Sequence, residues 1–244
     1  MGLMVNYKGF MGYYKLAKHD TVAAKRYFEE AYAKGLSKSS YLTAYATLLL
    51  QEKNYEKALE VFRKAYHAAD ATSQIKWSIK ANLATCYFKL DEKDQALEIA
   101  EELYENQKNG TAYVLYGYFL LNAGKTEEAL AVNLKGYEYD DEDAPICDNL
   151  GQTYYAMGDF ENAEKYFTKA LDIKDDMIDS LYFMAEIFCK KEKYNRAYEL
   201  LEEALDAPVP ALATVTKEKI QQKMQEIKSL CSTTLNEKGE EVDD

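Results

Sequence analysis

The sequence NLGQTYYAMGDFENAEKYFTKA, residues 149–170, carries two amphipathic helical patterns separated by a turn. The first pattern places small and apolar side chains on one helix face, at Leu150, Gly151, Tyr154 and Tyr155. The second places them at Ala163, Tyr166, Phe167, Ala170 and Leu171. Between the two patterns, residues 158–160 (GDF) stop one helix and start the next. Because small residues let two helix axes approach closely, this stretch predicts an antiparallel helix pair.

The same spacing recurs along the chain. Each copy begins with a small residue, and a second small residue follows twelve positions later. A residue that is usually bulky follows after four more positions, and the fourth residue of the series after another three. The six series are Gly12, Ala24, Phe28 and Ala31; Ala46, Ala58, Phe62 and Ala65; Ala84, Ala96, Ala100 and Leu103; Gly117, Ala129, Asn133 and Gly136; Gly151, Ala163, Phe167 and Ala170; and Ala185, Ala197, Leu201 and Ala204. Their leading residues are 34, 38, 33, 34 and 34 positions apart. Six copies at a nearly constant period predict an all-α solenoid.

One copy also carries the features of a known family. These features are Asn149-Leu150-Gly151, Tyr154, Gly158-Asp159-Phe160, Ala163, Phe167 and Ala170. They resemble a tetratricopeptide repeat (TPR), whose period is 34 residues. The resemblance covers about residues 5–208 and implies a right-handed superhelical solenoid of antiparallel helix pairs. It also implies a non-catalytic scaffold for protein–protein interaction.

The predicted domain organisation has three parts. Six TPR-like repeats occupy about residues 5–38, 39–72, 77–110, 110–143, 144–177 and 178–210. A capping helix is predicted at residues 211–232, because its apolar residues share one face at Ile220, Met224, Ile227 and Leu230. The acidic tail at residues 233–244 is predicted to be disordered.

Several positions depart from the repeat pattern. Lys15 stands where an aromatic residue or leucine is usual, and Asn133 stands at a normally apolar position. The third copy has Ala100 and Leu103 in place of a bulky residue followed by a small one. Four extra residues separate the second and third copies, which predicts a longer helix or loop around residues 70–77.

Composition limits the classes of function. Apolar residues make up 48% of the 244 residues, which is enough for a continuous core. The 30 Lys and Arg residues against 42 Asp and Glu residues give a net charge of −12. Nucleic acid and anionic membranes would be repelled by this excess, so neither is an expected partner. No stretch approaches the length of about 20 apolar residues that spans a bilayer, and residues 1–10 do not form a signal peptide.

The motifs for chemistry are weak. Residues 124–126 (GKT) imitate the end of a phosphate-binding loop, but Phe119 stands where that loop needs glycine. Residues 140–143 (DDED) lack the glycine and terminal glutamate of a calcium loop. His19 and His67 are the only histidines, and the repeat places no nucleophile beside either. We therefore predict no catalytic site, no cofactor and no metal.

The four cysteines are widely spaced. Cys86, Cys147, Cys189 and Cys231 form no closely spaced pair of the kind that binds zinc. A disulfide framework is typical of small secreted domains. The cysteines are therefore interpreted as free thiols in a reducing compartment, and the chain is expected to be cytoplasmic.

The resemblance also implies where a partner binds. In this family the first helices of successive repeats line a concave groove, which usually holds a peptide segment. The matching positions share helix faces, one turn apart. They are Tyr13, Thr43, Thr47, Gln51, Thr85, Phe88, Lys89, Val114, Tyr118, Asn122, Asp148, Gln152, Tyr155, Tyr182, Glu186 and Lys190.

This lining is polar and aromatic. We expect the tyrosines to anchor an extended or helical segment of a partner protein, and the polar side chains to bind its backbone. The acidic chaperone tails that some family members bind are disfavoured. Asn82 and Asn149 match the asparagine used there, but Thr43 and Val114 stand where the lysines are expected.

Other interpretations stay open. The chain could self-associate through its open first repeat and act as a structural protein. It could be the cytoplasmic repeat region of a membrane-anchored protein whose anchor lies upstream. It could also regulate a separate catalytic partner. The sequence leaves the partner and the oligomeric state undetermined.

Overall fold

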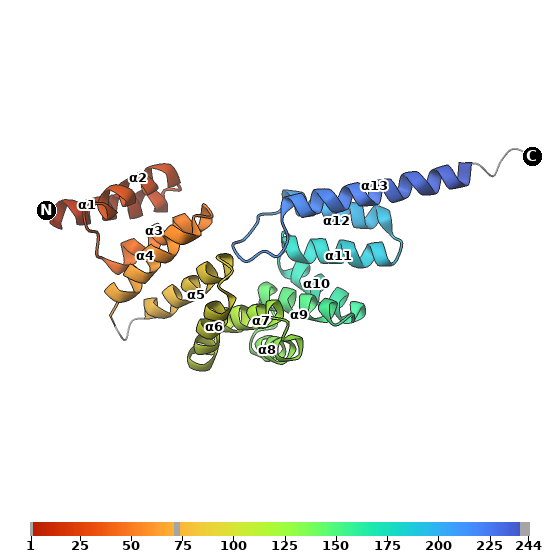
Figure 1. Cartoon of the computed structure of the whole chain (residues 1–244), viewed down its shortest axis with the longest axis horizontal. Coiled ribbons are helices and arrows are strands. Elements are labelled where there is room, and N and C mark those ends of the chain that lie inside the picture. The colour runs from red at the N-terminus through yellow and green to blue at the C-terminus, as the bar shows by residue number, and fades with distance from the viewer. Residues whose placement is uncertain (1, 71–73, 240–244) are drawn as a thin grey trace, which may run out of the picture. The chain divides into compact units, whose positions relative to one another are not determined.

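The computed structural model describes residues 2–70 and 74–239, with side chains described up to residue 230. All regular structure in this part of the chain is helical (Figure 1). The helices are α1 Gly2–Ala17, α2 Thr21–Tyr32, α3 Ser39–Gln51, α4 Tyr55–Ala68, α5 Gln74–Lys89, α6 Lys93–Gln107, α7 Gly110–Asn122, α8 Thr126–Tyr139, α9 Ala144–Ala156, α10 Phe160–Ile173, α11 Ile178–Lys190, α12 Tyr194–Asp206 and α13 Lys217–Gly239. These bounds confirm six helix pairs followed by a terminal helix.

The chain forms two compact units, residues 1–119 (unit 1) and residues 120–244 (unit 2), with the boundary inside α7. In unit 1, α1 packs on α2, α3 on α4 and α5 on α6, and α3 also contacts α1 and α5. In unit 2, α9 packs on α10 and α11 on α12, while α9 also contacts α8 and α11. The terminal helix α13 packs on α12. Within each unit, first helices therefore lie against the first helices of neighbouring pairs.

The turn inside each helix pair has one backbone conformation. Seven residues after each leading small residue, the chain adopts a positive φ, at His19, Lys53, Asp91, Gly124, Gly158 and Glu192. The next residue donates its backbone N–H to a carbonyl five residues earlier, as Asn54 does to Leu49 at 2.9 Å. This is the Schellman hydrogen bond that ends a helix. Only two of the six positions use glycine, the residue best suited to positive φ.

Capping side chains start several of the second helices. Asp20, Asn54 and Asp159 each accept a hydrogen bond from the backbone N–H three residues later. Such a cap satisfies one of the unpaired donors in the first helical turn. The positive-φ residue and the cap together reverse the chain in about three residues, so the two helices of a pair lie side by side.

In the first and fifth helix pairs, a small residue of the first helix faces a large ring of the second. Phe28, Phe62 and Phe167 are completely buried. A Cβ added at Gly12 would lie 2.7 Å from Phe28 Cδ1, and one added at Gly151 would lie 2.5 Å from Phe167 Cε1. The space of the missing side chain is therefore filled by the ring from the second helix of the same pair.

Two unusual positions are accommodated by local polar contacts. Asn133 is 1% exposed, and its Nδ2 donates to Thr153 Oγ1 at 3.1 Å. Burial of this amide is tolerated because its donor has a partner. Lys15 is half-buried and pairs with Asp20 at 3.1 Å.

Helix bounds differ from the sequence prediction at two places. The extra residues before the third copy lengthen α5, which has 16 residues where α3 has 13. The terminal helix begins at Lys217, because Thr216 accepts a hydrogen bond from the Lys219 backbone N–H and caps it. Its backbone continues to Gly239, since residues 217–238 contain neither proline nor glycine. Of the predicted disordered tail, residues 240–244 lie outside the described part of the chain.

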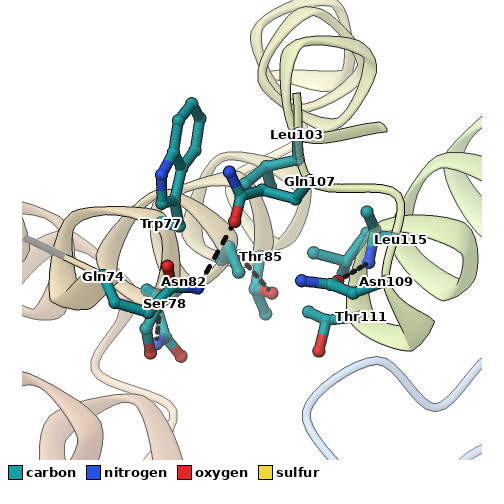
Figure 2. A pocket seen from close by; sticks show the side chains of 12 residues that line it. Gln74, Trp77, Ser78, Asn82, Thr85, Leu103, Gln107, Asn109, Thr111 and Leu115 are labelled. Carbon is teal, nitrogen blue, oxygen red and sulfur yellow. Dashed lines mark hydrogen bonds between the residues drawn. The ribbon is translucent and has the colours of Figure 1, made fainter. Parts of the chain in front are cut away.

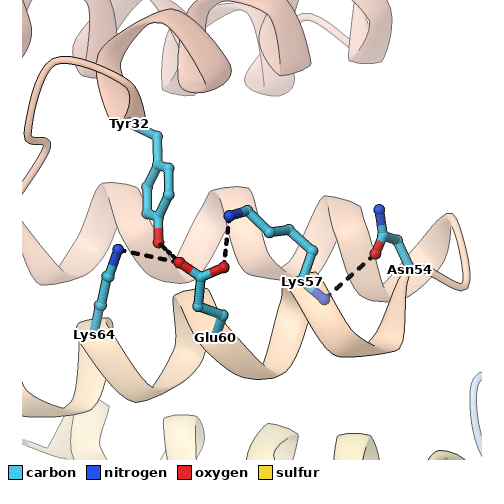
Figure 3. A network of polar contacts seen from close by, with 5 residues as sticks. All are labelled: Tyr32, Asn54, Lys57, Glu60 and Lys64. Atoms are coloured by element: carbon cyan, nitrogen blue, oxygen red, sulfur yellow. Dashed lines mark hydrogen bonds and ion pairs between the residues drawn. The ribbon is translucent and has the colours of Figure 1, made fainter.

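A polar network links the first two pairs on α2 and α4 (Figure 3). Glu60 accepts hydrogen bonds from Tyr32 Oη at 2.7 Å and from Lys57 Nζ at 2.6 Å. Lys64 Nζ lies 3.2 Å from the same carboxylate and 4.3 Å from the Tyr32 ring centre. These contacts lower the pKa of Glu60 to about 2, chiefly through the hydrogen bond from Lys57. The network is exposed to solvent, so its contribution to stability is small.

Gly151→Ala should destabilise the protein by about 1–3 kcal/mol, although alanine favours helix formation, because the new methyl group would displace the buried ring of Phe167. Urea unfolding followed by circular dichroism measures the effect. The double variant Gly151→Ala/Phe167→Leu should recover part of the loss, since leucine leaves room for the methyl group. An unchanged or higher unfolding midpoint for Gly151→Ala would contradict this description of the core.

Lys53→Gly should stabilise the protein by about 0.5–1 kcal/mol, because Lys53 has a φ of 62° that glycine adopts without strain. The neighbouring Glu52 has a φ of −77°, so Glu52→Gly is the matched control and should be slightly destabilising. Thermal unfolding of the two variants compares them directly. If both variants lower the melting temperature equally, the positive φ of Lys53 causes no backbone strain and the prediction is wrong.

Candidate protein-binding faces

The predicted binding residues of α1 and α3 lie on exposed or half-buried positions of unit 1. Tyr13 is 50% exposed, and its ring centre lies 6.2 Å from that of Tyr41. Thr43 and Thr47 are half-buried and donate to the backbone carbonyls one turn earlier, and Gln51 is exposed at the end of α3. Because these three α3 residues are four positions apart, they share one helix face.

The predicted residues of α5 and α7 are more buried. Thr85 is 7% exposed and donates to the carbonyl of Ala81. The Phe88 ring packs against Tyr118 and Phe119, with centre distances of 5.4 Å and 4.9 Å. Tyr118 is only 4% exposed, so most of its ring belongs to the core. Lys89, Val114 and Asn122 are half-buried.

A cavity of about 350 Å³ lies beside Thr85 in unit 1 (Figure 2). We call it the α5–α7 pocket. It is lined by Gln74, Trp77, Ser78, Ala81, Asn82, Thr85, Leu103, Gln107, Asn109, Thr111, Ala112 and Leu115. None of these lining residues carries a charge, and four of them are amides. The pocket therefore offers both hydrogen-bond donors and acceptors without an electrostatic preference.

Some of the pocket amides are held by neighbouring groups. Gln74 Nε2 donates to Gln107 Oε1 at 3.3 Å, and Asn82 Nδ2 donates to the Ser78 carbonyl at 2.9 Å. Asn109 accepts from the Ala112 backbone N–H at 3.0 Å and so caps α7. Figure 2 shows these side chains around the pocket. These hydrogen bonds restrict the side-chain conformations that a ligand would have to order, which lowers the entropic cost of binding.

In unit 2 the predicted residues of α9 and α11 form one hydrogen-bonded surface. We call this surface the α9–α11 face, and it comprises Asp148, Gln152, Tyr155, Tyr182, Glu186 and Lys190. Gln152 Nε2 donates to Asp148 Oδ2 at 2.7 Å. Tyr155 and Tyr182 donate to the two oxygens of Glu186, at 2.9 Å and 3.2 Å. Lys190 is exposed at the end of α11. Five of the six residues thus take part in hydrogen bonds within the face.

The chain's own C-terminal segment covers part of the α9–α11 face. Thr214 Oγ1 donates to Gln152 Oε1 at 3.2 Å, and Lys223 Nζ pairs with Glu186 at 2.9 Å. Lys219 Nζ lies 4.8 Å from the centre of the Tyr182 ring. Residues predicted to bind a partner thus bind residues of α13 and of the connection before it.

Asp148 is a buried carboxyl group beside a second one. Burial raises its pKa from 3.8 to about 7, and the negative charge of Asp179 adds to this rise. Hydrogen bonds from Ser180 Oγ at 2.5 Å and from Gln152 oppose it. Burial also disfavours ionisation of Glu186, but the hydrogen bonds that it accepts, first among them the one from Lys223, outweigh burial and lower the pKa of Glu186.

Several residues of these faces were missed by the sequence analysis. Asp179 is 6% exposed and accepts hydrogen bonds from the backbone of Thr214 and Val215. The sequence could have indicated Asp179, because it lies one helical turn before the predicted binding residue Tyr182 on α11. The α5–α7 pocket is also lined by Gln74, Trp77 and Gln107. Gln107 lies on the second helix of its pair, whereas the family resemblance places binding residues on first helices.

Other chemical features are sparse in the part of the chain that the structure describes. Cys86 and Cys147 are buried free thiols, and burial raises the pKa of Cys86 to about 12. The described side chains form no group of three or more His, Cys, Asp or Glu that could hold a metal ion. None of the described helices combines the length and apolar content needed to cross a bilayer.

Raising the pH from about 4 to 7 should lower the free energy of unfolding through Asp148. In this range the unfolded chain has lost the proton while the folded chain keeps it, so folding requires proton uptake. Asp148→Asn should remove this pH dependence, because asparagine has no proton to lose in this range. Denaturant unfolding between pH 4 and 8 measures the free energy of unfolding at each pH. Asp206→Asn, at an exposed position, is the control for the change in net charge. Parallel pH profiles for wild type and Asp148→Asn would exclude this role.

Three family models, each described as Tetratricopeptide repeat, match the chain. They match residues 11–73, 144–177 and 180–212, which together make up more than half of the chain. The matched segments coincide with the first two helix pairs and with the two pairs before α13.

Curated relatives are larger proteins. Superkiller complex protein 3 of Homo sapiens is 27% identical over 178 residues, covering 70% of this chain and 11% of the human protein. The BBSome complex member BBS4 homolog of Drosophila melanogaster is 23% identical over 185 residues, covering 75% of this chain and 37% of the fly protein. The chain thus spans about a tenth of the first relative and little more than a third of the second.

Solved structures share the fold. A thermophilic TPR protein of Thermus thermophilus has a TM-score of 0.65 at 18% identity, covering 78% of this chain and 98% of its own. A TPR protein of Parabacteroides merdae also has a TM-score of 0.65 at 19% identity, covering 93% and 90%. These similarities agree with the helix pairs, with the small residues that face buried rings and with the three matching family models. The chain belongs to the tetratricopeptide-repeat family.

Proposed function

We propose that the chain is a non-catalytic scaffold that binds a segment of a partner protein in the α5–α7 pocket of unit 1. The observation that carries this proposal is an uncharged cavity of about 350 Å³ lined by four amide side chains. The family supports a role in protein interaction in general. The pocket adds a specific place for the partner.

The chemistry of the pocket favours the backbone of an extended peptide. Each amide side chain offers both a donor and an acceptor, as each peptide group does. Trp77, Leu103 and Leu115 supply apolar surface for one or two side chains of the partner. Because the lining carries no cation, an acidic chaperone tail is a poor match for this pocket.

Fewer tyrosines are available to anchor a partner than the sequence suggested. Tyr118 is 4% exposed and packs on Phe88, so its removal would disturb the core before it disturbed binding. We therefore assign binding to the pocket amides and Trp77, with Thr85 as the predicted groove residue that also lines the pocket. Unit 1 has a second polar run on α3, at Thr43, Thr47 and Gln51, along which a longer peptide would extend.

Other features support a scaffold rather than an enzyme. The two histidines are exposed, at the α1–α2 turn and near the end of α4. Burial keeps Cys86 protonated, so its thiol is a poor nucleophile. Two relatives, a superkiller complex protein and a BBSome complex member, are named for multiprotein complexes. A cytoplasmic location is part of the proposal, because Cys86 and Cys147 are free thiols, as is usual in a reducing compartment.

A second candidate function is self-association through α1. Six large side chains of this helix are between 46% and 91% exposed, namely Leu3, Met4, Tyr7, Phe10, Tyr13 and Tyr14. A continuous apolar stripe of this kind often marks a protein interface. Sedimentation equilibrium of wild type and Tyr7→Glu/Phe10→Glu distinguishes the two candidates, since a monomer at high concentration excludes self-association.

Blocking the pocket should abolish peptide binding. Ten-residue peptides selected from a random library against the full chain serve as ligands, and Trp77, the only tryptophan, reports binding by its fluorescence. Ser78→Arg and Thr111→Arg place a long side chain at exposed positions of the pocket lining, and each should weaken binding by at least about tenfold. Gln95→Arg adds the same charge at an exposed position of α6 outside the lining and should bind normally. Equal binding by all four proteins, without a change in Trp77 fluorescence, would overturn the proposal.

A further inference from the structure

The connection between α12 and α13 differs from the other connections between helix pairs in unit 2. Residues 207–216 form ten residues without a helix, whereas four residues connect α8 to α9 and four connect α10 to α11. Pro208 and Pro210 lie in this stretch and prevent it from continuing α12. The placement of α13 therefore depends on the contacts that the segment makes, and not on a short turn.

The first group of contacts binds the backbone of the connection. Asp179 accepts the Thr214 N–H at 2.9 Å and the Val215 N–H at 2.8 Å. The Val215 side chain is completely buried, and Thr214 Oγ1 reaches Gln152 of α9. A carboxylate that receives two consecutive backbone N–H groups makes strong, charge-assisted hydrogen bonds.

The second group of contacts binds the first turns of α13. Lys223 pairs with Glu186, and Lys219 lies over the Tyr182 ring. Ile220 and Ile227 enter the core of unit 2 with 0% and 3% exposure. Cations of α13 thus meet a carboxylate and an aromatic ring of the α9–α11 face.

These contacts go beyond the requirements of a cap. A terminal helix that only shields the last repeat needs apolar contacts with α11 and α12, which Ile220 and Ile227 supply. Here the polar residues of the α9–α11 face are used as well, together with Asp179. The segment occupies the positions at which the family resemblance predicts a partner.

We propose that residues 213–227 are an intramolecular ligand of the α9–α11 face, and that a partner segment of the same chemistry binds this face by displacing them. The partner segment presents two consecutive backbone N–H groups in an extended stretch, followed by a helix with lysines on the side that meets Tyr182 and Glu186. This site lies in unit 2 and does not depend on the α5–α7 pocket.

The energetics of such a site follow from the tether. A tethered ligand acts at a high effective concentration, so it outcompetes the same segment added in solution. A free peptide therefore binds the wild-type chain weakly and binds tightly once the tethered segment is weakened. A change in apparent affinity with an unchanged binding face is the signature of this competition.

The test uses a labelled peptide of residues 209–228 and the full chain. Val215→Asp/Lys223→Glu in the chain weakens the tethered segment and leaves the α9–α11 face intact. Fluorescence anisotropy should show binding of the wild-type peptide to this variant at least about tenfold tighter than to the wild-type chain. A peptide with the same two substitutions should not bind, and adding Asp179→Leu to the variant should abolish binding. A helical variant that binds the peptide no better than wild type overturns the proposal.

A measurement on the unaltered chain covers the case in which the variant fails to fold. Hydrogen exchange followed by NMR compares the amides of Thr214 and Val215 with the core amides of α11 and α12. The proposal expects the two amides to be protected and yet to exchange through an opening that leaves α11 and α12 folded. If they exchange only with global unfolding, the segment is an integral part of the fold and the proposal is wrong.

Discussion

The close approach of the two helices in each pair, which requires a small buried residue on the first helix, is the constraint on which the rest of the structure depends. Phe28 fills the space left at Gly12, and Phe167 fills the space left at Gly151. The ring comes from the second helix of a pair and the small residue from the first, so the contact sets the distance between the helices. The short turn with its positive-φ residue lets the chain reverse and make this contact. Repetition of this unit gives first helices a neighbouring first helix to pack against.

The same arrangement produces surfaces for binding. Second helices contribute the buried rings of Phe28, Phe62 and Phe167, while first helices contribute polar residues one turn apart. In unit 1 these residues border the α5–α7 pocket, which is uncharged and lined by four amides, two of which hydrogen-bond to each other. In unit 2 the corresponding residues hydrogen-bond to one another and to the chain's own C-terminal segment. One repeated scaffold thus presents a pocket in one unit and a covered face in the other.

The sequence was sufficient to predict the helix pairs, because Gly151, Ala163 and Phe167 recur with a fixed spacing that only one packing satisfies. It also located the turns, although Lys53, Asp91 and Glu192 give no sign of a positive φ. The binding faces were predicted less completely. Burial of Tyr118 and Tyr182 depends on neighbouring pairs and is not encoded in either helix alone. The contacts of Asp179 with Thr214 and Val215 join residues about 35 positions apart through a segment outside the repeat, so no periodicity could indicate them.

Side-chain NMR gives the most direct test of the central claim that this chain is a peptide-binding scaffold with its open site in unit 1. The Asn and Gln NH₂ groups are visible individually in nitrogen-labelled protein, and a selected peptide can be titrated against them. The account predicts that the signals of Asn82, Gln107 and Asn109 shift together on binding, while that of Gln95, outside the pocket, stays unchanged. Shifts confined to Gln95 or to other residues away from the pocket would contradict it.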